Sequence, residues 1–139
     1  MFDGECKVMT KSLFNKIDCV RIPVPNLEDG IDFYSKKLGH ELLWKTKASA
    51  GLQISEDKSE IVLYTEPEGL EIDFQVKDVQ LAVREFIQAG GKLVKGPFEI
   101  PIGKCVVVKD PWDNQYVILD SSKGTFETDE NKQVIGLKQ

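Results

Sequence analysis

Residues 17–24 read Ile-Asp-Cys-Val-Arg-Ile-Pro-Val, and residues 25–39 read Pro-Asn-Leu-Glu-Asp-Gly-Ile-Asp-Phe-Tyr-Ser-Lys-Lys-Leu-Gly. The first stretch alternates and is rich in β-branched residues, which predicts a strand. In the second stretch, apolar residues recur at helical spacing after Asn26, a favourable N-cap residue, and Gly39 is placed to end the helix. Three short strand-like runs follow, at about 41–47, 50–55 and 60–65. This part of the chain therefore predicts the order β-α-β-β-β.

The same order starts again near residue 70. Leu70 to Val76 alternate between apolar and polar residues, Asp78 can cap a helix that Gly90-Gly91 ends, and strand-like runs follow at about 92–95, 104–109 and 115–120. A shift of 52 residues, which takes Cys19 onto Glu71, superimposes the strands, caps and helix ends of the two halves. A module of about 50 residues is too small to bury both its sheet and its helix alone. The sequence therefore predicts an α+β fold in which tandem β-α-β-β-β modules form two curved mixed sheets around a cleft, with the helices outside.

The repeat also predicts the domain organisation. Residues 13–121 form one domain, with module one at 13–68 and module two at 69–121. Residues 1–12 are polar without a clear period and are interpreted as an N-terminal arm. Residues 122–139 are interpreted as a polar C-terminal tail, in which the apolar patch Val134 to Leu137 could add an edge strand or pack on a partner.

Composition excludes several classes of protein. The 139 residues include 18 basic and 23 acidic side chains, and a net charge of −5 disfavours nucleic acid as a partner. No apolar run is long enough to span a bilayer, and the N-terminus lacks a signal peptide, so we expect a cytoplasmic protein that does not bind membranes. Three cysteines without a C-x-x-C motif indicate reduced thiols, and the single histidine, His40, argues against a His- or Cys-rich zinc site.

Three stretches together carry a resemblance to a known family: Ile17 to Gly39, Glu71 to Gly91, and the turn Lys109 to Asn114. They resemble the vicinal oxygen chelate superfamily, which includes glyoxalase I, bleomycin-resistance proteins, fosfomycin-resistance enzymes and extradiol dioxygenases. The resemblance covers about residues 14–121 and implies the tandem fold. It says less about function, because this fold supports many chemistries.

In metal-using members, the resemblance implies four ligands, one on the first and one on the fourth strand of each module. The corresponding residues here are Cys19, Val62, Glu71 and Val117, with Glu60 or Tyr64 as alternatives to Val62. Valine has no donor atom, and a thiolate with one carboxylate is a poor set for a hard divalent ion. We therefore expect no resident metal and no other cofactor, with a divalent metal as the less favoured alternative.

Strand alternation predicts which side chains face the cleft. This set is Cys19, Arg21, Val62, Tyr64, Glu71, Asp73, Gln75, Val117 and Leu119. On the opposite face, Val20 and Ile22 should pack on the first helix, and Ile72, Phe74 and Val76 on the second. The cleft mixture suits a small organic ligand with a polar or cationic group. The competing interpretation is structural: Glu71 and Asp73 form a solvated face paired with Arg21, while Cys19, Cys105 and Trp44 serve packing.

These observations leave functions of different classes open. The first is a small-molecule-binding protein of the glyoxalase/bleomycin-resistance type that lacks the usual metal ligands. The alternative is a metal-dependent glyoxalase-related lyase, isomerase or dioxygenase, with a rearranged site built from Glu71 and one or two of Glu60, Tyr64, Glu66 and Asp73. A third is a regulatory subunit with a vestigial cleft. We also expect a homodimer, because small members of the superfamily often pair and an apolar edge strand at Val134 to Leu137 invites pairing.

Overall fold

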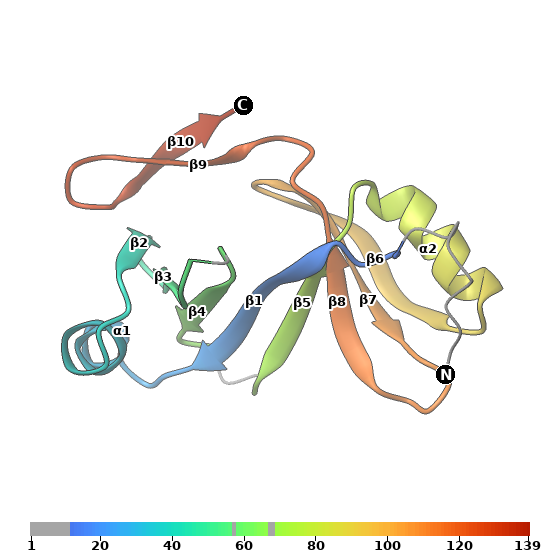
Figure 1. The fold of residues 1–139 in the computed structure, drawn as a ribbon, viewed down its shortest axis with the longest axis horizontal. Helices are drawn as coiled ribbons and strands as arrows, with labels where there is room; N and C mark the ends of the chain where they lie inside the picture. The colour runs from blue at the N-terminus through green and yellow to red at the C-terminus, as the bar shows by residue number, and fades with distance from the viewer. Residues whose placement is uncertain (1–11, 57, 67–68) are drawn as a thin grey trace.

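The computed structural model describes residues 12–56, 58–66 and 69–139, so most of the predicted N-terminal arm lies outside the described residues. Module one contains β1 (Lys16–Pro23), α1 (Leu27–Ile31), η1 (Asp32–Lys37), β2 (Leu42–Lys45), β3 (Ser49–Gln53) and β4 (Glu60–Tyr64). Module two contains β5 (Glu71–Gln75), α2 (Val79–Gln88), β6 (Lys92–Ile100), β7 (Gly103–Lys109) and β8 (Gln115–Leu119), and β9 (Thr125–Thr128) and β10 (Val134–Lys138) follow. The predicted α+β order is confirmed (Figure 1).

The two modules share one continuous mixed sheet of eight strands, in the order β2-β3-β4-β1-β5-β8-β7-β6. The two curved sheets expected from the sequence are thus two halves of one sheet. They join because β1 and β5 pair antiparallel, which satisfies backbone groups that would otherwise form two open edges. In this junction Val20 of β1 lies opposite Ile72 of β5. The outer neighbours of the two strands are equivalent: Arg21 of β1 lies opposite Val62 of β4, and Asp73 of β5 lies opposite Val117 of β8.

Both helices begin at their predicted caps. The Asn26 side chain accepts a hydrogen bond from the Asp29 amide at 2.9 Å, and Asp78 accepts one from the Leu81 amide at 3.0 Å. The first helix is less regular than expected, because η1 is a π-helix in which the Leu38 amide donates to the Phe33 carbonyl at 3.0 Å. It ends at Gly39, whose φ of +89° favours glycine.

The helices cover only the two ends of the outer sheet face (Figure 1). Helix α1 contacts β3 and β4, while α2 contacts β6 and β7 and packs Phe86 into the core. The centre of this face, over β1 and β5, lies between them. Ile72 is 44% exposed there, so the expectation that it packs on the second helix is wrong. The reason is that β5 sits at the middle of the continuous sheet, beyond the reach of either helix.

Residues 122–139 do not extend away from the domain as a tail. Strands β9 and β10 pair antiparallel, and the hairpin runs from the end of β8 back over β2 (Figure 1). The Lys45 amide donates to the Lys132 carbonyl at 2.8 Å, and the Phe126 ring lies 4.9 Å from the Trp44 ring, centroid to centroid. The hairpin therefore packs on the inner side of module one. Among the residues described, no helix is long and apolar enough to cross a membrane.

Candidate functional site

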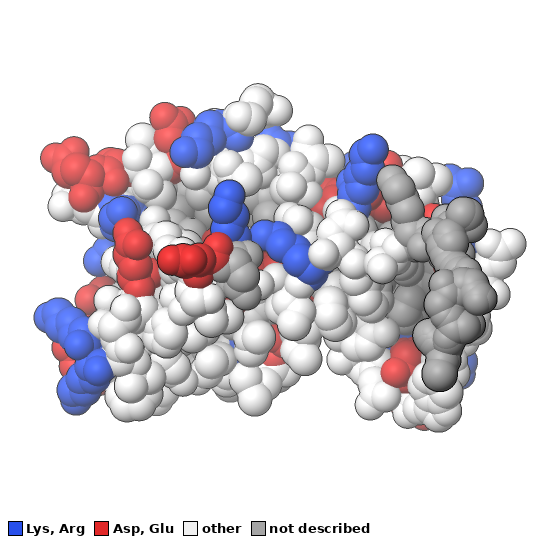
Figure 2. Space-filling model, viewed as in Figure 1, with Lys and Arg blue, Asp and Glu red and all other residues white. Residues whose placement is uncertain are grey.

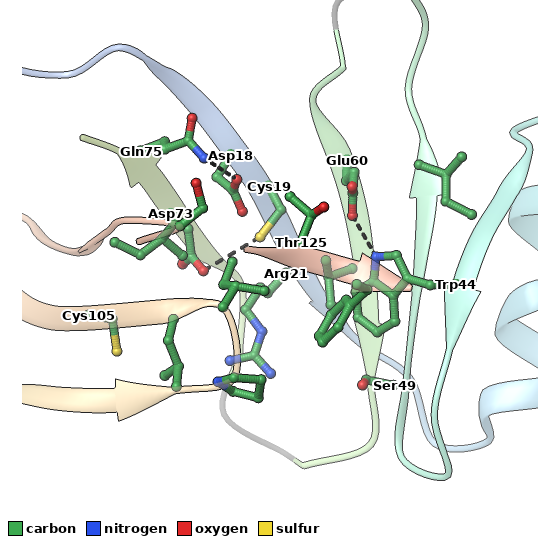
Figure 3. Close-up of a pocket in the computed structure, with 18 of the residues that line it drawn as sticks. Asp18, Cys19, Arg21, Trp44, Ser49, Glu60, Asp73, Gln75, Cys105 and Thr125 are labelled. Atoms are coloured by element: carbon green, nitrogen blue, oxygen red, sulfur yellow. Dashed lines mark hydrogen bonds between the residues drawn. The ribbon is translucent and has the colours of Figure 1, made fainter. Parts of the chain in front are cut away.

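The inner face of the sheet and the C-terminal hairpin enclose a cavity of about 840 Å³. Strands of both modules line it, because the β1–β5 junction forms its floor (Figure 3). Eight residues predicted from alternation line this cavity: Cys19, Arg21, Val62, Glu71, Asp73, Gln75, Val117 and Leu119. Figure 3 shows Asp73, Cys19 and Gln75 gathered on one side and Glu60 with Trp44 on the other, with Arg21 between them.

Tyr64, also predicted to face the cleft, is not part of the cavity lining. Its side chain is buried, and its hydroxyl donates a hydrogen bond to the Gly69 carbonyl. The Arg21 guanidinium lies 4.2 Å from the centre of the Tyr64 ring. Tyr64 therefore supports Arg21 from the side and does not offer its hydroxyl to the cavity.

The structure adds cavity residues that alternation did not assign. Asp18 reaches the cavity together with Cys19, because a register shift between Ile17 and Cys19 breaks the alternation of β1. Trp44 and Cys105, interpreted as packing residues, also line the cavity. The hairpin contributes Thr125, Phe126, Thr128 and Lys138. The alternation of Thr125 to Thr128 was a usable strand signal, but nothing local indicated that this strand would fold back over the sheet.

Asp73 is the most buried acidic residue of the cavity lining. The residue is only 5% exposed, and its Oδ2 accepts a hydrogen bond from the Cys19 thiol at 3.5 Å. Its Oδ1 has no hydrogen-bond partner among the residues that the structure describes. Burial, followed by the adjacent Glu71 carboxylate, raises the pKa of Asp73 to about 8. Arg21 does not neutralise Asp73, because its Nη1 pairs with Glu71 Oε2 at 3.5 Å.

Two further carboxylates of the cavity have partners. The Trp44 Nε1 donates to Glu60 Oε1 at 2.9 Å, and the side-chain Nε2 of Gln75 donates to Asp18 Oδ1 at 3.5 Å. Burial is the largest cause that raises the pKa of both Glu60 and Asp18. The Trp44–Glu60 bond also fixes the indole in the cavity wall, where it packs against Phe126.

The outer surface differs from the cavity in its charge distribution: on the face shown in Figure 2, acidic and basic side chains are interspersed without a large patch of one sign.

Comparison with known proteins identifies the family. The model of the Glyoxalase/Bleomycin resistance protein/Dioxygenase superfamily matches residues 16–118. The chain belongs to this superfamily. The match confirms the resemblance inferred from the repeat, and it spans both modules. No curated protein sequence matches the chain significantly.

Solved structures of superfamily members share this fold. Methylmalonyl-CoA epimerase from Mycobacterium tuberculosis superposes with a TM-score of 0.69 at 17% identity, over 81% of this chain and 92% of that one. Methylmalonyl-CoA epimerase from Streptomyces coelicolor gives 0.65 at 17% identity, over 78% and 99%. A variant of homoprotocatechuate 2,3-dioxygenase from B. fuscum gives 0.58 at 20% identity, over 78% of this chain and 33% of that one. At these identities the similarity shows the fold and not the activity.

The superfamily's metal positions can be tested against the geometry. The symmetric pairing of Arg21 with Val62 and of Asp73 with Val117 makes the two valines equivalent, which supports Val62 over Glu60 or Tyr64 as the fourth-strand position. Neither valine has a donor atom. Burial and the nearby Asp73 raise the pKa of the Cys19 thiol, which disfavours the thiolate that a metal needs. Nowhere in the described chain do three or more His, Cys, Asp or Glu side chains group to hold a metal ion. The residues do not fit the four-ligand metal.

Proposed function

We propose that this chain is a small-molecule-binding protein of the glyoxalase/bleomycin-resistance type that works without the superfamily's four-ligand metal. The observation that carries the proposal is the cavity itself, which has apolar walls and a few converging polar groups at the junction of the two modules. Its volume of about 840 Å³ lies within the range of pockets for small organic molecules. A cavity of this composition binds by burying an apolar body and orienting one polar group.

The apolar wall has a defined shape. Trp44 and Phe126 form an aromatic corner between β2 and the hairpin, and Val62, Val117 and Leu119 extend the wall across the sheet. The Glu60 bond holds Trp44, so the corner exists before a ligand arrives. Preformed apolar surface of this kind supplies affinity without an ordering cost.

The alternative is a metal-dependent lyase, isomerase or dioxygenase with a rearranged site. The fold shared with the epimerases and the dioxygenase favours it, and Glu60, Glu71 and Asp73 are oxygen donors at the same cavity. Tyr64 and Glu66 drop out of this set, because the Tyr64 hydroxyl is bonded to Gly69 and Glu66 lies outside the cavity lining. These carboxylates are a weaker argument than the cavity, because Glu71 is paired with Arg21 and Glu60 accepts from Trp44.

Two measurements separate these functions. Metal content after purification without chelator should be far below one ion per chain, and Ni²⁺, Zn²⁺, Mn²⁺ and Fe²⁺ should not raise the melting temperature. By contrast, some members of a library of small organic molecules should raise the melting temperature, because a ligand that binds only the folded state stabilises it by mass action. Thr125→Trp should block the cavity and abolish these shifts, while Glu127→Trp, on the same strand but outside the lining, should preserve them. Stoichiometric metal, or small-molecule shifts that persist in Thr125→Trp, would reject the proposal.

We also propose that the protein is a homodimer. Strand β10 pairs only with β9 among the described residues, and Ile135 is 62% exposed on it. An apolar strand with an unpaired edge favours association. Sedimentation at micromolar concentration should give a dimer, and Ile135→Glu should shift it toward monomer while Val94→Glu, on β6, should not. A wild-type monomer would contradict this assignment. The cytoplasmic location stays a prediction.

A further inference from the structure

Asp73 Oδ1 is an unsatisfied acceptor in the floor of the cavity. Three ionisable groups face its side chain from other strands: the thiols of Cys19 on β1 and Cys105 on β7, and the guanidinium of Arg21 on β1. Glu71 faces it from its own strand, β5. Cys19 binds the other oxygen, Oδ2, and Arg21 is paired with Glu71 and stacked on Tyr64. The described part of the chain therefore supplies no donor to this oxygen.

The three lysines of the lining give Oδ1 no hydrogen bond. Lys58 and Lys138 are exposed, and the charge of Lys16 acts on Asp18 and Glu60. Without a donor, an ionised Asp73 would be a buried, unpaired charge beside a second carboxylate. A donor that arrives with a positive charge would satisfy Oδ1 and remove this cost.

We propose that the ligand of this cavity carries a cationic N–H group, an ammonium, amidinium or guanidinium, that donates to Asp73 Oδ1 while its apolar body lies against Trp44 and Phe126. This inference rests on the proposed function and deepens it by giving the ligand's charge and its anchor. An anionic group in the same place would meet Glu71 and Asp73 together and be repelled. A cation would instead satisfy the orphan oxygen and offset the paired carboxylates.

The test compares three probes with one apolar body: 4-phenylbutylguanidinium, 4-phenylbutanol and 4-phenylbutyrate. Binding is followed by calorimetry and by amide shift changes of cavity residues. We expect the guanidinium probe to bind about tenfold or more tightly than the alcohol at about pH 8.5, a difference of about 1.4 kcal/mol. Asp73→Asn should remove most of this preference. The matched control Asp113→Asn removes the same charge from an exposed turn and should leave the preference unchanged.

Equal affinity of the three probes, or full preference in Asp73→Asn, would overturn the inference and leave the proposed function standing. Failure of all three probes to bind would instead reject the proposed function.

Discussion

Replacing Asp73 with Asn should make stability less dependent on pH. In the unfolded chain this carboxyl has its ordinary pKa, whereas in the folded protein burial and Glu71 raise the pKa to about 8. Between these values the folded state keeps a proton that the unfolded state has lost. The free energy of unfolding of the wild type should therefore fall as pH rises through this window, and level off above it. Asparagine has no such proton, and its Nδ2 can donate to Glu71.

The size of this pH-dependent change in stability follows from the difference between the folded and unfolded pKa of Asp73. A difference of about four pKa units, at about 1.4 kcal/mol each, sets a ceiling of about 5 to 6 kcal/mol for the penalty of ionised Asp73. Between about pH 5 and pH 8 the ceiling on the change is about 3 to 4 kcal/mol. Glu71 is 29% exposed at its side chain and can turn toward water, which relieves part of the penalty. We expect the stability of Asp73→Asn relative to wild type to increase by about 2 kcal/mol or more over this range.

Urea unfolding followed by circular dichroism, at several pH values from about 5 to 8, measures this change directly. Asp113→Asn, which alters an exposed turn carboxylate, provides the baseline for loss of one negative charge. If the free energies of unfolding of the wild type and Asp73→Asn differ by an amount that stays constant within about 0.5 kcal/mol over this pH range, the reasoning is refuted. In that case no proton is taken up at Asp73 on folding.

Three further changes test the fold and the register. Asp120→Ala should destabilise the domain by about 3 kcal/mol in urea unfolding, because a buried carboxylate that accepts from two backbone amides of other elements is lost; a loss below about 0.5 kcal/mol would contradict this. In Gly51→Ala the new Cβ would lie 2.1 Å from Trp44 Nε1, so the indole must leave the wall and its fluorescence should shift; Gly136→Ala, where a Cβ meets nothing within 4 Å, is the neutral control. Cys19→His with Val117→Glu should raise Ni²⁺ affinity by calorimetry, since two donors join Glu71; no gain would show that the metal register is assigned wrongly.

Local sequence was sufficient to predict the tandem modules. Alternation in residues 17–24 and 70–76 specified the strands, while Asn26 and Asp78 specified where the helices begin. These features depend on neighbouring residues, whose backbone geometry and hydrogen bonds are local. Alternation also extended the ligand positions implied by the resemblance to the eight residues that line the cavity, because every second residue of a strand shares a face.

The partners of those side chains depended on the tertiary structure. Arg21 could have paired with either carboxylate of β5, and only the antiparallel register, which places it opposite Glu71, leaves Asp73 without a base. The shift in β1 that turns Asp18 into the cavity, and the hairpin that brings Phe126 onto Trp44, likewise join residues more than 50 positions apart. Periodicity fixes the face of a strand that a residue occupies, but register between distant strands and the path of the chain after β8 follow from the packing of the whole sheet.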